Sequence, residues 1–180
     1  MSQSTPQNAV FTPLDFQLMP LCLPNKGRFR TVFGEIMEKF NLPRHLKVFG
    51  VQVRTFPAGV GDAFKSLMGM FPKGDSRSYY GISEFAKDGS IVYYATAEET
   101  YEGEAEKYNC NVYVVKKGEY LSVTVSDWMV KTDSIKDVFE NLMKDVRVDK
   151  TNPCMEWYKT ENEMLCMMRM DEQIIREGNK

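Results

Sequence analysis

The sequence LKVFGVQVRT, at residues 46–55, decides how the chain around it is interpreted. It is rich in valine and phenylalanine and alternates in the manner of a β-strand. Residues 59–70 follow it with apolar side chains at helical spacing, and Pro72 ends that pattern. We therefore expect a strand followed directly by an amphipathic helix.

Two more strands are expected next, at residues 77–85 and 90–97. The dipeptide Asp88-Gly89 between them favours a tight β-hairpin, because glycine readily adopts the backbone angles that such a turn needs. The acidic stretch at residues 98–107 is interpreted as a solvated link. From the first strand onward, the order is thus strand, helix, strand, strand.

The same order of elements recurs in the second half of the chain. Thr132, Asp133 and Ser134 favour a helix start, and Ser134 with Asp137 approximates a capping box. The apolar side chains that follow again fall on one face of a helix. The expected ranges are 110–115 and 120–126 for two strands, 134–146 for the helix, and 155–158 and 164–170 for two closing strands.

The two halves can also be aligned residue by residue. Placing Leu46 on Leu121 places Phe64 on Phe139 without a gap, and a shift of two residues aligns the closing hairpins. This agreement predicts an internal duplication. The predicted fold class is α+β, in which two pseudo-symmetric strand–helix–strand–strand repeats form an antiparallel sheet with the helices on one side and a central cleft.

The segment before this region is interpreted separately. Residues 28–41 carry apolar side chains at helical spacing between Gly27 and Pro43. We therefore expect residues 1–45 to form an N-terminal extension with one amphipathic helix, and residues 46–180 to form the duplicated domain.

Composition argues against several classes of function. The net charge is −2 and the basic residues are dispersed, so no nucleic-acid-binding surface is expected. The four cysteines form no CxxC pair and the chain has one histidine, so we expect no metal site and no cofactor. No signal peptide or membrane-spanning run is apparent, and the predicted location is the cytoplasm with reduced thiols.

Four short stretches, taken in order, resemble the GyrI-like small-molecule-binding family. They are VFGVQVRT at 48–55, YGI at 80–82, KGEY at 117–120 and MEWY at 155–158. The resemblance covers roughly residues 46–171. It implies a first strand, a central strand, a Gly-x-Tyr start to the second half, and a strand that lines a pocket.

The family also includes the effector-binding domains of AraC-type and multidrug-sensing transcription regulators. Those sensors carry a DNA-binding domain, which does not fit before residue 46. The resemblance therefore implies a stand-alone ligand-binding form, related to transcription regulation, that does not bind nucleic acid by itself.

Glu156 is the leading candidate for the site. It lies in a strand otherwise made of Cys, Met, Trp and Tyr, where an unpaired carboxylate is costly to bury. Alternation places Tyr158 on the same face of that strand. Glu156 could instead pair with a buried Arg or Lys, or face water; the resemblance favours a pocket in which it meets a cationic or polar ligand group.

Aromatic side chains are the expected walls of this pocket. Ser83 is the residue that corresponds to Glu156 in the first half, so only one half supplies an acid, which suits a single ligand. The candidate wall residues are Phe56, Tyr79, Tyr80, Tyr101 and Trp128.

The expected function is binding of a small hydrophobic or cationic aromatic ligand, in order to sense or sequester it. One alternative is a hydrolase of strained small molecules that uses Glu156 as a base together with the Tyr158 hydroxyl. Another is a protein-binding module of the gyrase-inhibitor type. A homodimer through a sheet edge or through the helix at 28–41 is also compatible with the sequence.

Overall fold

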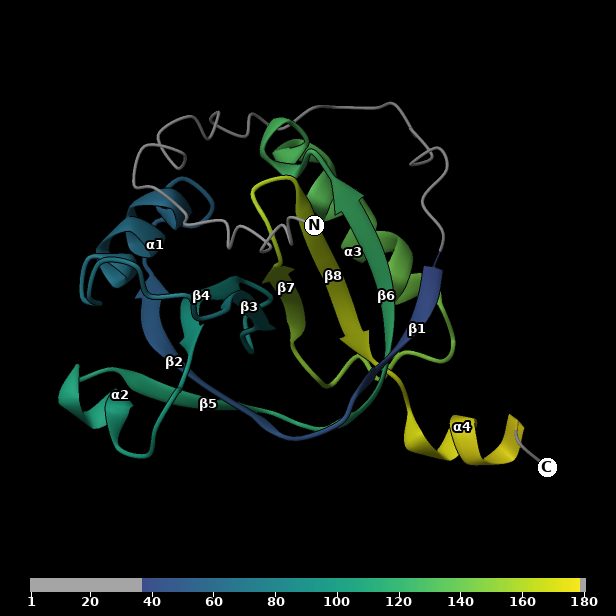
Figure 1. The fold of residues 1–180 in the computed structure, drawn as a ribbon. Helices are drawn as coiled ribbons and strands as arrows, with labels where there is room; N and C mark the ends of the chain where they lie inside the picture. The colour runs from purple at the N-terminus through teal and green to yellow at the C-terminus, as the bar shows by residue number, and fades with distance from the viewer. Residues whose placement is uncertain (1–36, 179–180) are drawn as a thin grey trace, which may run out of the picture.

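The computed structural model describes residues 37–178, which form one antiparallel sheet with four helices (Figure 1). The strands are β1 (Met37–Leu42), β2 (Leu46–Val53), β3 (Tyr79–Phe85), β4 (Ile91–Glu98), β5 (Asn111–Val115), β6 (Gly118–Ser126), β7 (Cys154–Tyr158) and β8 (Glu163–Arg169). The helices are α1 (Val60–Met68), α2 (Glu104–Lys107), α3 (Thr132–Lys144) and α4 (Glu172–Gly178), with a short 3-10 turn at Trp128–Val130.

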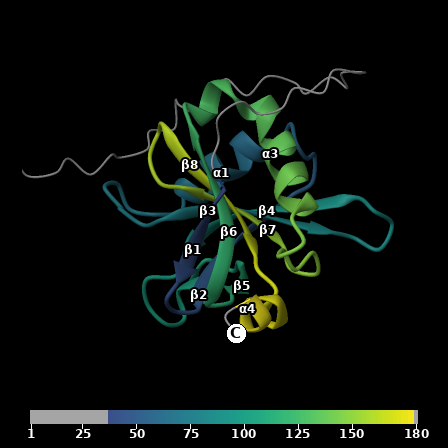
Figure 2. The same ribbon diagram turned by 90° about the vertical axis from the view of Figure 1, so that its right-hand side faces the viewer.

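Helices α1 and α3 lie on the same face of the sheet, each over its own half (Figures 1 and 2). Helix α1 packs on β2 and β4, and α3 packs on β6 and β8. Both helices are amphipathic, so burying the apolar stripe of each against the sheet drives their docking. The buried stripe residues are Val60, Phe64 and Leu67 in α1, and Val138, Phe139 and Leu142 in α3. The predicted α+β fold class is thereby confirmed.

The opposite face of the sheet carries its own apolar cluster. Successive residues of a strand point to opposite faces, so each central strand contributes side chains to both clusters. The buried members on this face are Leu46, Val48, Tyr80, Ile82, Tyr120, Met155, Leu165 and Met167. Strand β5 and helix α4 lie at the end of the molecule away from α1 and α3 (Figure 1).

The strand order is β1-β6-β8-β7-β3-β4-β2-β5. The strands β7 and β3, which correspond in the two halves, lie at the centre. Their neighbours β8 and β4 also correspond, and so do the next strands outward, β6 and β2. This is the order that two repeats related by a twofold axis would give. A common origin of the two halves stays a prediction.

The helix predicted at residues 28–41 is wrong for residues 37–41, and its remainder lies outside the described residues. Residues 37–42 instead pair with β6 as strand β1. Phe40 and Leu42 are half-buried while their neighbours are exposed, which is a period of two. A short apolar pattern fits both the helical period and the strand period of two, and pairing with β6 decides between helix and strand.

The acidic stretch at residues 98–107 is not a solvated link throughout. It contains α2, in which the Glu104 side chain is buried against Arg77. The predicted capping box is also absent, because the Ser134 hydroxyl donates to the Lys131 carbonyl instead. Within residues 37–178, no helix has both the length and the apolar character needed to cross a bilayer.

Candidate functional site

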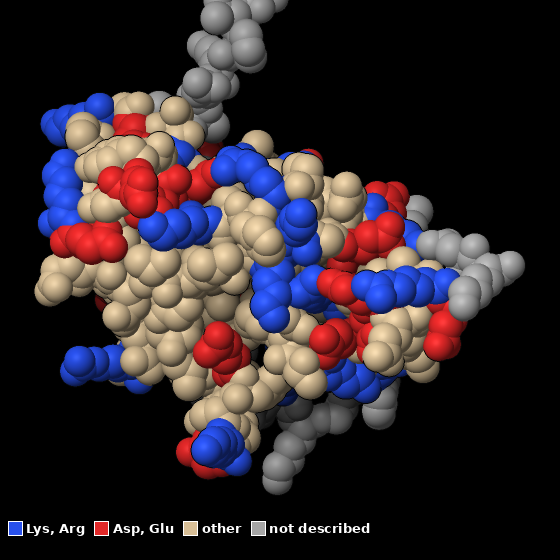
Figure 3. Space-filling view, turned by 90° about the horizontal axis from the view of Figure 1, so that it is seen from below, with Lys and Arg blue, Asp and Glu red and all other residues tan. Residues whose placement is uncertain are grey.

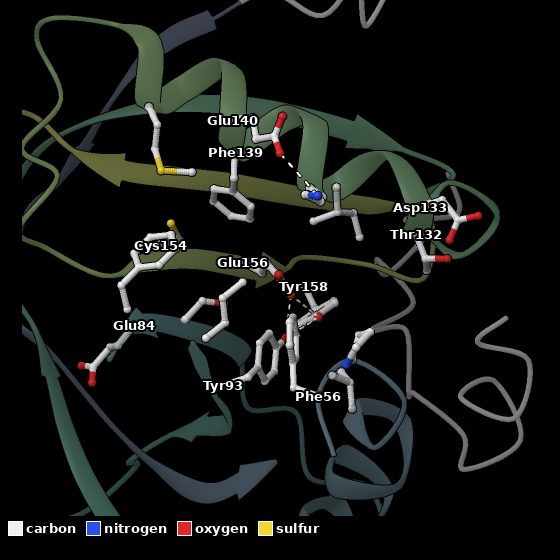
Figure 4. Close-up of a pocket in the computed structure, with 18 residues that line it drawn as sticks. Phe56, Glu84, Tyr93, Thr132, Asp133, Phe139, Glu140, Cys154, Glu156 and Tyr158 are labelled. Atoms are coloured by element: carbon white, nitrogen blue, oxygen red, sulfur yellow. Dashed lines mark hydrogen bonds and ion pairs between the residues drawn. The ribbon is translucent and has the colours of Figure 1, made fainter. Parts of the chain in front are cut away.

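A cavity of about 290 Å³ lies over the two central strands, between α3 and the loop that leads into α1 (Figure 4). Its surface is almost entirely apolar, with Phe56 and Tyr93 on one side and Phe139 and Met143 of α3 on the other. Ligand sites commonly have this character, with a few polar groups placed among apolar walls. The question is which polar groups this cavity presents.

Glu156 of β7 is the polar group at the base of the cavity, and only 8% of its surface is exposed. Its Oε2 accepts hydrogen bonds from the hydroxyls of Tyr93 and Tyr158, each at 2.6 Å. The two hydroxyl oxygens are 3.0 Å apart. The other carboxylate oxygen, Oε1, receives no hydrogen bond from residues 37–178. That oxygen is the one available to a bound molecule.

Gly81 of β3 makes room for this arrangement. It pairs with Glu156 across the β3–β7 ladder. A Cβ at residue 81 would lie 1.9 Å from the Tyr93 hydroxyl oxygen and 2.7 Å from Glu156 Oε2. Such distances are far below van der Waals contact, so the hydrogen-bonded cluster requires glycine at this position.

The electrostatics of the cluster are dominated by burial. Removal from water raises the pKa of Glu156, and the hydrogen bonds from Tyr158 and Tyr93 offset part of that rise because they favour the charged form. Burial, together with the nearby Glu156 carboxylate, raises the pKa of Tyr93 and Tyr158 well above the ordinary value, so both remain neutral donors.

No positive charge of the described residues pairs with Glu156, and Lys136, which lines the same cavity, pairs with Glu140. The ion pairs within residues 37–178 include none to this carboxylate, and no neighbouring cation contributes to its pKa. The alternative that Glu156 pairs with a buried Arg or Lys therefore does not hold for this part of the chain. No group of three or more His, Cys, Asp or Glu side chains that could hold a metal ion occurs in the same residues.

Glu156, Tyr158 and Phe56 line the cavity, as does Ser83. Phe56 stacks on Tyr93 with the ring centroids 5.0 Å apart. Tyr158 and Glu156 share a face of β7, as alternation predicts. These residues come from three separate parts of the sequence.

The other expected wall residues lie elsewhere, and Tyr101 among them is exposed and does not line the cavity. Trp128 is 1% exposed and packs edge-on behind Tyr158, and its indole N–H donates to the Thr160 carbonyl. Tyr79 is on the helix-covered face but packs against Phe71. Tyr80 is one residue further along β3, so it points to the opposite face and joins the second apolar cluster.

Tyr93 is the functional candidate that sequence reasoning missed. The sequence does contain a signal for this residue. Tyr93, Ala95 and Ala97 lie on one face of β4, and the two small alanines leave space beside the large ring of Tyr93. What the sequence lacks is the register that brings β4, β3 and β7 side by side. Phe139 and Met143 belong to the helix predicted at residues 134–146, and they also line the cavity.

No family model matches the chain, and no curated protein sequence matches it. Solved structures with the same fold do exist. An integron cassette protein from Vibrio cholerae is 15% identical with a TM-score of 0.54, over 77% of this chain and 97% of its own. The protein SAV2435, in a structure bound to tetraphenylphosphonium, is 11% identical with a TM-score of 0.54, over 82% and 100%.

A third structure, of a bacterial transcription regulation protein from Staphylococcus aureus, is 13% identical with a TM-score of 0.50, over 77% of this chain and 98% of its own. At these identities the likeness establishes the fold alone.

Proposed function

We propose that this protein binds a lipophilic aromatic cation in the cavity, with Glu156 as its counter-ion. The observation that carries the proposal is a buried carboxylate at the base of an apolar cavity without a cation partner among the described residues. Burying a charge is costly unless an opposite charge accompanies it. A ligand that brings the missing positive charge recovers that cost, and an equally large neutral ligand does not.

The chemistry of the walls favours a cation that needs no hydrogen-bond acceptors. One oxygen of Glu156 is engaged by two tyrosines, which leaves the other oxygen as the one free acceptor atom of this carboxylate. A primary ammonium group needs about three acceptors, whereas a phosphonium or quaternary ammonium needs none. The rings of Phe56, Tyr93 and Phe139 add cation–π attraction and apolar contact.

The fold relationship supports the same class of ligand. SAV2435, which shares the fold, was solved bound to tetraphenylphosphonium, an aromatic cation without hydrogen-bond donors. A protein of this kind would sense or sequester its ligand, and the similar fold of a transcription regulation protein supports a link to regulation.

Hydrolysis of a strained small molecule is the second candidate. The observation that favours it is the raised pKa of Glu156, because a carboxylate shifted toward neutral pH is a better general base toward water. The Tyr158 hydroxyl beside it could donate a proton to the leaving oxygen. Catalysis requires that a bound compound is also consumed.

A thermal-shift screen of lipophilic cations and neutral aromatics tests the proposal. A ligand that binds the native state raises the melting temperature with concentration. We expect tetraphenylphosphonium to do so, and Glu156→Gln to reduce its effect strongly. Glu140→Gln is the matched control, since Glu140 lies at the cavity rim and pairs with Lys136.

Each stabilising compound is then incubated with the protein and analysed by mass spectrometry. Intact compound supports a binding protein, and a hydrolysed product that disappears in Glu156→Gln supports the second candidate. If no cation stabilises the protein, or Glu140→Gln and Glu156→Gln behave alike, the proposal is wrong.

A further inference from the structure

A second cavity, of about 410 Å³, lies on the opposite face of the sheet. Ile82 of β3 and Met155 of β7 contribute its apolar surface, and both belong to the cluster on that face. The aromatic rings of Tyr113 and Tyr120 flank it. Because β3 and β7 alternate, this cavity and the one at Glu156 are separated by the sheet itself.

The charged group that distinguishes this cavity is Arg169, at the end of β8. Its side chain is 12% exposed. Its Nη2 donates to the Lys117 carbonyl and to Glu172 of α4, a carboxylate that is 56% exposed. Its Nε and Nη1 form no hydrogen bond with residues 37–178. Neither nitrogen is among the buried polar atoms that lack a partner, so these N–H donors open onto solvent or the cavity, where a bound molecule can reach them.

Gly118 lies beside the Arg169 guanidinium. Its φ of +138° is a backbone conformation that other residues rarely adopt, and a Cβ there would lie 3.4 Å from Arg169 Nη2. Two residues on, the Tyr120 hydroxyl donates to the Lys116 carbonyl at 2.6 Å, which fixes its ring beside the cavity. The Gly-x-Tyr pattern at residues 118–120 therefore builds this cavity and not the one at Glu156.

The charge around the second cavity is opposite in sign to that around the first. Arg169 and Lys116 line it, against one carboxylate, Glu84. The side of the molecule that carries β5 and α4 is viewed in Figure 3, where Lys and Arg side chains form a band across the middle with acidic groups on both sides. A ligand with a negative group is therefore attracted to this side of the sheet.

We propose that this cavity is a second ligand site that takes a small aromatic carboxylate. The carboxylate accepts from the free Arg169 donors, and the flat apolar body lies between Tyr113 and Tyr120 against Met155. Arginine presents a planar array of donors that matches a carboxylate, and aromatic rings favour a flat partner. This site does not depend on the function proposed for the first cavity.

The probe is 2-naphthoate, with uncharged 2-naphthamide as its matched control, and binding is measured by isothermal titration calorimetry. We expect 2-naphthoate to bind at least tenfold more tightly than 2-naphthamide, and Arg169→Gln to remove that preference. Arg176→Gln is the control variant, because Arg176 also pairs with Glu172 on α4 but does not line the cavity. It should bind 2-naphthoate like the native protein.

Methyl NMR of the native protein places the ligand without any variant. A bound naphthalene ring should shift the methyl signal of Met155, in this cavity, and leave that of Met143, in the first cavity, unchanged. The proposal is overturned if 2-naphthoate does not bind at millimolar concentration, if Arg169→Gln binds it as the native protein does, or if Met143 shifts in place of Met155.

Discussion

Among residues 37–178, two acidic residues, Glu104 and Glu156, are buried, and their surroundings differ. Glu104 is 1% exposed and accepts from Arg77 at 2.8 Å and from the backbone N–H and hydroxyl of Thr100. Burial alone would raise its pKa, but these hydrogen bonds and the Arg77 charge lower it overall. Glu156 is 8% exposed, has two neutral tyrosine donors, and has a raised pKa because burial dominates.

The difference separates a structural carboxylate from a candidate binding group. The charge of Glu104 is balanced inside the fold, and Arg77 itself lies 3.8 Å from the centre of the Phe71 ring. Glu156 has no cation partner among the described residues, and its carboxylate faces a cavity. Burial alone therefore does not mark a site, whereas burial without an internal counter-charge does.

The largest expected effect concerns Glu104. Glu104→Gln removes one carboxylate partner of the buried Arg77 and leaves it paired with Asp75 alone, which should lower the free energy of unfolding by about 3 kcal/mol. Glu106→Gln, at an exposed position of the same helix, is the control and should change it by less than about 0.5 kcal/mol. Urea denaturation measures both. Equal stabilities would mean that Arg77 and Glu104 do not form a structural pair.

The next effect concerns the space that Gly81 leaves for the Tyr93–Glu156 hydrogen bond. Gly81→Ala should cost about 1–3 kcal/mol of stability, because the added methyl group has no room in a packed interior. It should also weaken cation binding by displacing Glu156. Gly74→Ala is the control, since Gly74 has positive φ but no atom near a Cβ, and it should cost stability alone. Normal cation binding by Gly81→Ala would contradict the geometry.

The two carboxylates should also respond to pH in opposite directions. Glu104 has a lowered pKa, so its stabilising contribution is present near neutral pH and is lost on acidification. Glu156 has a pKa above its ordinary value of 4.5, so its ionisation costs stability as pH rises through that raised value. The stability of Glu156→Gln relative to the native protein should therefore increase with pH above about 4.5 and then level off.

Cation affinity should follow the same titration. Below the raised pKa of Glu156 it should increase by up to about tenfold per pH unit, and above it the affinity should be constant. Affinities measured between pH 5 and pH 8 test this dependence. A flat profile in the native protein, or the same slope in Glu156→Gln, would show that this carboxylate is not the titrating group.

The smallest expected effect is that of a single tyrosine hydroxyl. Tyr158→Phe removes one of the two donors to Glu156, which disfavours its charged form and should weaken cation binding near neutral pH by about three- to tenfold. Tyr93→Phe should act similarly, and the double variant should show less than the sum of both effects, because the hydroxyls share one acceptor. Additive losses would show that the two tyrosines act independently.

Much of the fold could be predicted from the sequence. The periodicities of residues 46–55 and 59–70 and the Asp88-Gly89 turn correspond to β2, α1 and the β3–β4 hairpin. Residues 37–41 were wrongly predicted as part of a helix, because so short a segment depends on pairing with β6 for its structure. Likewise, the burial of Glu104 depends on Arg77, 27 residues away in the sequence.

The candidate site was predictable only where one strand decides the geometry. Glu156 and Tyr158 share a face because they are two residues apart, and no other information is needed. Tyr93 joins them through two strand pairings whose registers the sequence does not specify. Tyr80 lies on the opposite face by the same alternation, because it is next to Gly81, which pairs with Glu156.

The central claim is that the Glu156 carboxylate recognises the charge of a ligand. Isothermal titration calorimetry with methyltriphenylphosphonium and the similarly shaped neutral triphenylphosphine oxide, on the native protein and on Glu156→Gln, measures this directly. We expect the variant to bind the cation at least tenfold more weakly, about 1.4 kcal/mol, and to bind the neutral compound within about twofold of the native affinity. Equal losses for the two compounds, or no loss for the cation, would contradict the claim.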